Sequence, residues 1–258
     1  ERGHQDATQS SPSPLTDGKR LYAYFGSRGL YCLDMDGKVL WEHDFGDMET
    51  RNGFGEGASP ALYRDTLVLN WDHEGDDFIV ALDAATGKEK WRKPRDEPTT
   101  WATPLIVEHG GTAQVITSGT KRVRSYDLAT GEIVWETEGL TANVIPSPVH
   151  HDGVVYCMSG FRGASAKAIR LSDAKGELTG PPAIIWTYSK DTPYVPSPLY
   201  YDGALYFFEN NRAFLTVLDA ANGKPHYAKE RLSEMRGFYA SPVAAAGRVY
   251  LAGRDGKT

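Results

Sequence analysis

Cysteine and methionine are scarce in this 258-residue chain, with two and four copies. The two cysteines, Cys32 and Cys157, lie far apart in the sequence, which favours two small buried apolar side chains. No apolar run reaches the roughly 18 residues that a membrane-spanning helix needs, so we expect no transmembrane segment. The first residues also lack the basic and then apolar pattern of a signal peptide.

Positive charge is lacking too, since 28 Lys and Arg stand against 34 Asp and Glu, which gives a net charge of −6. A nucleic-acid groove normally presents a basic face, so we expect no nucleic-acid partner. The chain has no G-x-S-x-G, no H-E-x-x-H and no phosphate loop, so no catalytic motif appears. Glycine, proline and tyrosine are plentiful, a mixture that favours strands and tight turns over helices.

A repeat organises the chain. The pair Ser-Pro, once Thr-Pro, recurs at residues 13, 59, 103, 147, 197 and 241, with steps of 44 to 50 residues. Each unit continues with a polar turn, an apolar strand and a third strand that ends in aspartate. A turn such as "DAATGK" or "DLATGE" follows, and a fourth strand carries a large aromatic residue. These aromatic residues are Trp41, Trp91, Trp135, Trp186 and Tyr227.

Four strands in a unit of about 45 residues are the sequence mark of a β-propeller blade. We therefore predict an all-β propeller of four-stranded antiparallel blades, in which the recurring aromatic residue packs one blade against the next. The predicted blades cover residues 12–45, 58–95, 102–138, 146–188 and 196–230, with a partial blade at 240–258. About five and a half blades leave an open edge, which indicates a fragment of a longer propeller.

The segments "ALDAATGKEKW", "SYDLATGEIVW" and "CLDMDGKVLW" resemble the PQQ-like propeller repeat, with its A-x-D-x-x-T-G-x-x-x-W pattern. Families built from this repeat include quinoprotein alcohol dehydrogenases and the lipoprotein of the outer-membrane barrel-assembly machinery. The resemblance implies a ring of eight blades and a place outside the cytoplasm, periplasmic or secreted. Because the matching residues are structural, it implies much about fold and little about function.

The catalytic members of this family carry a disulfide between adjacent cysteines and a calcium held by carboxylate and amide side chains. Cys32 and Cys157 are not adjacent, and the calcium ligands of those enzymes find no match in this chain. We therefore expect no cofactor. Pyrroloquinoline quinone (PQQ) and calcium belong only to the alternative of a quinoprotein dehydrogenase, part of whose site would lie in other blades.

One face of the predicted propeller gathers the loops between strands two and three and the loops between blades. The strand 2–3 loops repeat an arginine, and the blade-to-blade loops add aromatic residues and Asn, a composition typical of recognition surfaces. The other interpretation is that each arginine braces its own loop, since a feature of every repeat is usually architectural. The candidate binding residues are Arg28, Arg51, Asn52, Phe54, Trp101, Arg122, Asn143, Arg162, Tyr194, Arg212, Arg236, Phe238 and Tyr239.

The second blade alone has an acidic strand 2–3 loop, "DHEGDD", with Asp72, Glu74, Asp76 and Asp77 around His73. It is either a turn kept soluble by its charges, a salt-bridge hub or a metal site. The pattern is not an EF-hand loop, and histidine suits transition metals better than calcium. We predict that at least one of the carboxylates pairs with an arginine of an adjacent blade or blade-to-blade loop, Arg51 and Arg28 being the first candidates.

Three functions remain open at this point. The first is a non-catalytic propeller that binds a protein or glycan partner through the loop face. The second is an extracytoplasmic dehydrogenase that depends on PQQ and calcium. The third is a scaffold without a small ligand.

Overall fold

A computed structural model describes residues 11–258, and within them the regular structure is β-strand apart from short 3-10 turns. Each turn has three residues: η1 (Gly26–Arg28), η2 (Arg51–Gly53), η3 (Leu171–Asp173) and η4 (Glu209–Asn211). The described residues contain no helix that is long and apolar enough to cross a membrane. The predicted all-β class is confirmed.

The first three sheets follow the chain in order, and within each of them the consecutive strands run antiparallel. Their strands are β1 (Leu15–Thr16), β2 (Arg20–Tyr24), β3 (Leu30–Asp34), β4 (Val39–His43), β5 (Ala61–Tyr63), β6 (Thr66–Trp71), β7 (Phe78–Asp83), β8 (Glu89–Pro94), β9 (Leu105–His109), β10 (Thr112–Thr117), β11 (Arg122–Asp127) and β12 (Ile133–Glu138).

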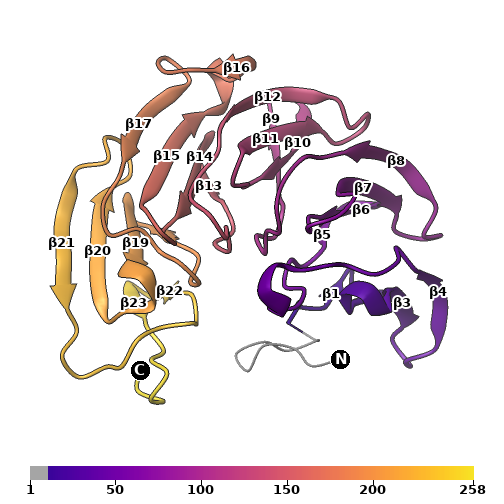
Figure 1. The fold of residues 1–258 in the computed structure, drawn as a ribbon, viewed down its shortest axis with the longest axis horizontal. Coiled ribbons are helices and arrows are strands. Elements are labelled where there is room, and N and C mark those ends of the chain that lie inside the picture. Colours follow the sequence, from indigo (N-terminus) through magenta and orange to yellow (C-terminus); the bar gives the residue numbers. More distant parts are fainter. Residues whose placement is uncertain (1–10) are drawn as a thin grey trace.

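The remaining sheets continue the series and end in a two-stranded sheet. Their strands are β13 (Val149–His151), β14 (Val154–Ser159), β15 (Ser165–Arg170), β16 (Gly176–Leu178), β17 (Ile184–Tyr188), β18 (Leu199–Tyr201), β19 (Ala204–Phe208), β20 (Phe214–Asp219), β21 (Pro225–Arg231), β22 (Val243–Ala245) and β23 (Arg248–Tyr250). Figure 1 shows the sheets side by side in an open arc, with β1, β5 and β13 towards the centre and β4, β8, β17 and β21 at the rim. The predicted partial propeller is confirmed.

One sheet departs from the predicted pattern. Strand β16 pairs in parallel with β12, so the third blade has five strands although the prediction gave it four. In the sequence, β16 belongs to the fourth blade, where residues 171–183 replace the tight turn before the last strand. This insertion accounts for the 50-residue step between Ser147 and Ser197, and its length lets it reach the rim of the preceding blade.

The core lies between the blades, because the central strands of the second, third and fourth blades are largely buried on both faces. Along β6 every residue is buried, and the alternation of a strand sends successive side chains to opposite neighbours. Leu67 and Leu69 pack with Tyr22 of the first blade, whereas Val68 packs with Val115 of the third. Similar apolar clusters join the third blade to the fourth and the fourth to the fifth.

The recurring tryptophan and the recurring glycine form one contact between blades. Trp91 Nε1 donates to the carbonyl of Leu128 at 2.8 Å, and Trp41 and Trp186 donate in the same way to Ala84 and Ala220. The glycine of the same turn packs against the indole ring of the neighbouring blade. A Cβ on Gly131, for example, would come within 2.7 Å of the Trp91 ring. The predicted packing role of the aromatic residue is confirmed for these blades.

The Ser-Pro pairs form a chain of hydrogen bonds near the centre of the arc. In each link the backbone N–H of one Ser or Thr donates to the hydroxyl oxygen of its counterpart in the next blade, at 2.9–3.1 Å. The chain runs through Ser13, Ser59, Thr103, Ser147, Ser197 and Ser241. The serine therefore recurs because each blade must both donate to the next and accept from the one before.

Replacing Ser147 with alanine should lower the free energy of unfolding by about 1–2 kcal/mol, since the N–H of Thr103 loses its acceptor. Ser13→Ala is the matched control, because the Ser13 hydroxyl accepts no such bond from residues 11–258, and it should change stability by less than about 0.5 kcal/mol. Urea denaturation followed by tryptophan fluorescence measures both. Equal losses in the two variants would contradict a stabilising role for the chain of hydrogen bonds.

Candidate functional site

A cavity of about 560 Å³ opens among the loops between blades and the loops between second and third strands. Eight of the predicted binding residues line it: Arg51, Asn52, Phe54, Trp101, Asn143, Arg162, Tyr194 and Tyr239. They come from loops spread over residues 51–239, so residues far apart in the sequence meet at one place. The repeat brings them together because it returns a loop to the same face in every blade.

Aromatic side chains give the cavity its walls. Phe54 meets Trp101 edge-on, with ring centroids 6.2 Å apart, and Trp101 Nε1 is held by the carbonyl of Gly55 at 2.8 Å. Phe161 and Tyr194 stack at 4.7 Å. Tyr239 is 42% exposed, and the guanidinium of Arg254 lies 4.1 Å from its ring centre.

Several lining residues escaped the sequence analysis, namely Ile145, Phe161, Val195 and Asn211. Phe161 and Asn211 belong to strand 2–3 loops, "SGFRG" and "ENNRA", whose only predicted binding residue is the arginine. Their place in these loops was the sequence signal that could have identified them. Ile145 and Val195 each precede a proline in a blade-to-blade loop and carry no signal that separates a lining residue from a core residue.

The other predicted binding residues lie outside the cavity. Phe238 is buried and stacks on Phe208 at 3.8 Å, so it is a core residue. Arg122 pairs with Glu177 of the inserted strand at 2.7 Å, which fits the bracing interpretation. The remaining three are exposed: Arg28, Arg212 and Arg236.

The acidic loop, residues 72–77, is not the solvated turn that was one of the open interpretations. Asp72 and His73 are buried, whereas Glu74 and Asp76 are exposed. The Asp72 carboxylate accepts two hydrogen bonds from the guanidinium of Arg95, at 2.6 and 3.1 Å, and neither side chain is exposed. A pairing with an arginine of a blade-to-blade loop is therefore confirmed, but the expected partners Arg51 and Arg28 are wrong.

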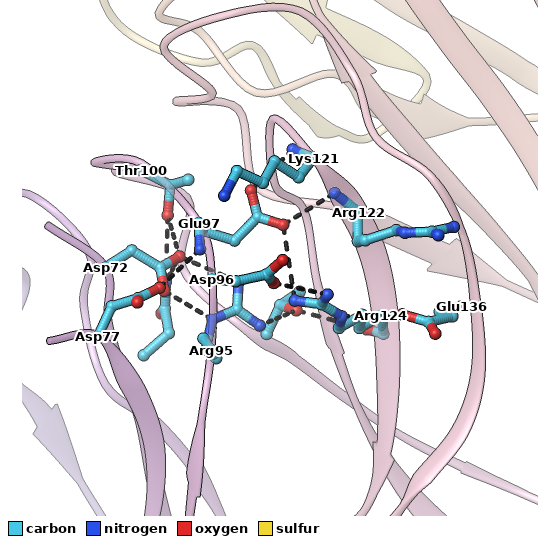
Figure 2. Close-up of polar contacts among 12 residues, drawn as sticks. Asp72, Asp77, Arg95, Asp96, Glu97, Thr100, Lys121, Arg122, Arg124 and Glu136 are labelled. Carbon is cyan, nitrogen blue, oxygen red and sulfur yellow. Dashed lines mark hydrogen bonds and ion pairs between the residues drawn. The ribbon is translucent and has the colours of Figure 1, made fainter. Parts of the chain in front are cut away.

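Arg95 escaped prediction because it directly follows strand β8 and its partner, Asp72, lies 23 residues away in the sequence. Its guanidinium also donates to the hydroxyls of Thr117 and Tyr126, at 3.0 and 2.8 Å, so the buried charge is surrounded by acceptors. Thr100 completes the Asp72 side of the pair with a hydrogen bond of 2.5 Å. Figure 2 shows this cluster at the junction of the second and third blades.

The acidic loop also fixes the two blade-to-blade loops beside it. His73 Nδ1 accepts from the N–H of Glu49, in the loop that leads to Arg51. The Glu74 carboxylate accepts from the hydroxyl and the N–H of Thr99, at 2.8 and 3.1 Å, and the same hydroxyl accepts from the N–H of Arg51. Burial acts to raise the pKa of Glu74, but the hydrogen bonds from Thr99 and the charge of Arg51 lower it overall.

A second buried carboxylate holds the strand 2–3 loop of the third blade. Glu97 accepts hydrogen bonds from the N–H groups of Lys121 and Arg122, both at 2.8 Å, and its own N–H donates to Asp77 (Figure 2). Burial raises the pKa of both Glu97 and Asp77, against these hydrogen bonds, which lower it. The loop that Glu97 holds contributes no residue to the cavity, so within this cluster it is the Glu74–Thr99 contact that bears on the cavity loops.

The four carboxylates of the acidic loop do not converge on a common point. Asp72 is directed to Arg95, Glu74 to Thr99 and Asp77 to the N–H of Glu97. Within residues 11–258 no group of three or more His, Cys, Asp or Glu side chains is arranged to hold a metal ion. The metal interpretation of this loop therefore has no support in its geometry.

Comparison with known proteins agrees with the repeat and the fold. The profile of the family described as outer membrane protein assembly factor BamB matches residues 1–109 and 75–258. A search of curated proteins gave no match. Among solved structures, BamB from Moraxella catarrhalis is similar with a TM-score of 0.66 and 17% identity, over 97% of this chain and 72% of that one.

Two dehydrogenases are similar in fold as well. A europium-containing methanol dehydrogenase gives a TM-score of 0.57 at 19% identity, over 83% of this chain and 50% of that one. The quinohemoprotein alcohol dehydrogenase ADHIIG from Pseudomonas putida HK5 gives 0.56 at 16% identity, over 85% and 42%. This chain thus spans half or less of either enzyme, and at these identities the likeness shows the fold alone. On the match of the family profile, the chain belongs to the PQQ-like β-propeller family described as outer membrane protein assembly factor BamB.

Proposed function

We propose that this chain is a non-catalytic propeller that binds a protein or glycan partner through the loop face. The observation that carries the proposal is the cavity of about 560 Å³, which is built from loops of successive blades and lined by aromatic, Arg and Asn side chains. Its volume lies in the range of roughly 300–1,000 Å³ that is usual for ligand sites. Aromatic and arginine side chains are also the residues that contribute most to binding at interfaces.

The buried polar cluster around Asp72 and Arg95 also supports this proposal. Fully satisfied polar networks make a structure rigid, and rigid support is what a preorganised binding surface needs. Here the Asp72–Arg95 pair and the Glu74–Thr99 contact fix the loops that carry Arg51 and Trp101. We also propose that the chain works outside the cytoplasm, in keeping with a family described by an outer-membrane assembly factor.

The second candidate is a quinoprotein dehydrogenase, because two dehydrogenases, one of them a quinohemoprotein, share this fold. The residues present do not fit its cofactors. Calcium takes six to eight oxygen ligands, yet none of the described residues that line the cavity is acidic. The two cysteines are free, buried and in different blades. The non-catalytic function is therefore the better supported of the two.

The test is to probe peptide and glycan arrays with the purified protein and with a Trp101→Ala/Tyr239→Ala variant. We expect reproducible binding on at least one array, reduced at least about tenfold in the variant. Thr86→Ala/Lys88→Ala, in a turn that contributes no residue to the cavity, is the control and should bind like the wild type. The proposal fails if neither array is bound, or if the cavity variant binds as well as the control.

The same preparation serves for the second function. The protein is given the quinone, calcium and an alcohol, and reduction of a dye is followed. We expect no turnover, and turnover would favour the dehydrogenase.

A further inference from the structure

We propose that the partner reaches this cavity as an extended peptide segment that carries carboxylate side chains between apolar ones. The inference rests on the proposed function and names the chemistry of the partner. Four properties of the cavity support it: its charge, the arrangement of its aromatic rings, its amide groups and its backbone conformation.

The charge of the cavity is opposite to that of the chain as a whole. The chain carries a net charge of −6, but the described residues that line the cavity include Arg51 and Arg162 and no Asp or Glu. Neither arginine lies within ion-pair distance of a carboxylate in residues 11–258, although the charge of Arg51 acts on Glu74 and Arg162 lies 5.3 Å from the ring centre of Phe161. Guanidinium groups that are not already paired are suited to bind carboxylates in a two-pronged geometry.

The aromatic rings favour apolar side chains over sugar rings. A sugar stacks on the open face of an aromatic ring, but Phe161 and Tyr194 each have one face covered by the other, at an interplanar angle of 23°. Phe54 stands edge-on to Trp101 at 84°, so these rings form a corner and not a flat platform. Ile145 and Val195 add aliphatic surface that cannot bond to sugar hydroxyls. Such walls fit leucine-like or aromatic side chains of a peptide.

Asparagine amides are placed to bind a peptide backbone. Asn52, Asn143 and Asn211 all line the cavity, and a primary amide offers both the donors and the acceptor that a peptide group requires. The Asn143 side chain, in a residue only 3% exposed, makes no hydrogen bond with residues 11–258. Asn211 uses its oxygen to accept from the N–H of Val195 and keeps its two donors.

Four of the ten described non-glycine residues with positive φ line this cavity. Asn52, Asn143, Arg162 and Asn211 all have positive φ, between 51° and 63°. Residues other than glycine seldom adopt this conformation, and such residues gather at binding sites where the surrounding structure holds them. The surrounding structure therefore holds the backbone of the cavity loops at these four positions.

The experiment is a selection of random heptapeptides displayed on phage, with the purified wild-type protein as bait and Arg51→Gln/Arg162→Gln as counter-bait. We expect the wild type alone to enrich peptides with two or more Asp or Glu beside aliphatic or aromatic residues. An enriched peptide is then synthesised with blocked ends and titrated by calorimetry. We expect the double variant to bind it at least about tenfold more weakly.

Arg28→Gln/Arg212→Gln is the matched control, since it removes the same charge from exposed loop arginines that do not line the cavity. It should bind within about twofold of the wild type. Affinity should also fall severalfold between 50 and 300 mM NaCl, because salt screens exposed charges. Both variants replace exposed side chains, so equal melting temperatures show that any loss is one of binding.

Each other outcome overturns the inference. Enrichment of neutral or basic peptides, or equal binding by the two double variants, excludes an acidic segment as the partner. Tetragalacturonate is titrated alongside as an anionic sugar probe. If it binds in an Arg51- and Arg162-dependent way while no peptide is enriched, the peptide inference fails and the proposed function stands. If the arrays also show no binding that depends on the cavity, both fail.

Discussion

Replacing Asp72 with asparagine should lower the free energy of unfolding by about 3–5 kcal/mol. The substitution keeps the shape of the side chain but leaves the guanidinium of Arg95 buried without its bidentate partner, in a site where neither side chain is exposed. A buried charge that loses its counter-ion bears the full cost of its removal from water. Urea denaturation followed by tryptophan fluorescence gives the change in the unfolding midpoint.

The control lies in the same loop. Asp76→Asn removes an exposed carboxylate that forms no hydrogen bond or ion pair with residues 11–258, and it should change stability by less than about 0.5 kcal/mol. A double variant, Asp72→Leu/Arg95→Met, should lose less than Asp72→Asn alone, since no unpaired charge remains. A midpoint for Asp72→Asn that coincides with that of Asp76→Asn would show that the pair does not stabilise the fold.

Replacing Gly131 with alanine should cost about 2–5 kcal/mol, the second largest effect that we expect. Gly131 has φ of +73°, where an L-residue is strained by about 1–2 kcal/mol. The added methyl would also lie 2.7 Å from the Trp91 ring, and overpacking of this kind costs about 1–3 kcal/mol more. Thermal unfolding followed by circular dichroism measures the loss.

Gly37→Ala separates the two contributions. Gly37 occupies the matching turn of the first blade and has φ of +87°, but nothing lies within 4 Å of its added methyl. It should therefore lose only the conformational part, about 1–2 kcal/mol. If both variants lose the same amount, the contact between glycine and tryptophan adds no steric cost, and the glycine recurs only for its conformation.

The fold could be predicted from sequence because its determinants are local and repeated. A strand that ends in aspartate, a turn with glycine and a strand with tryptophan return at nearly constant spacing, and each copy supports the same interpretation. The fifth strand of the third blade could not be predicted. The insertion showed only as a longer step between Ser147 and Ser197, and nothing in "GEL" says that it pairs with the preceding blade.

The candidate site was predictable in part, for a physical reason. Propeller topology tells which loops share a face, so residues such as Trp101 and Tyr194 could be grouped before their positions were known. It does not tell which side chains of a loop point inwards, and Phe238 was therefore grouped with them although it is buried. Arg95 was missed because its importance depends on one partner in three dimensions, Asp72, and not on any repeated pattern.

The hydrogen-bond chain through the Ser-Pro pairs bears on how such proteins change in evolution. Every link has the same direction and the same chemistry, from a backbone N–H to the hydroxyl of the next blade. A gene segment that adds or deletes one whole unit, such as the 44 residues from Thr103 to the next serine, leaves every junction with a matched donor and acceptor. The number of blades can thus change by duplication or deletion of whole units. The sequences of the loops that form the binding face can diversify independently of that number.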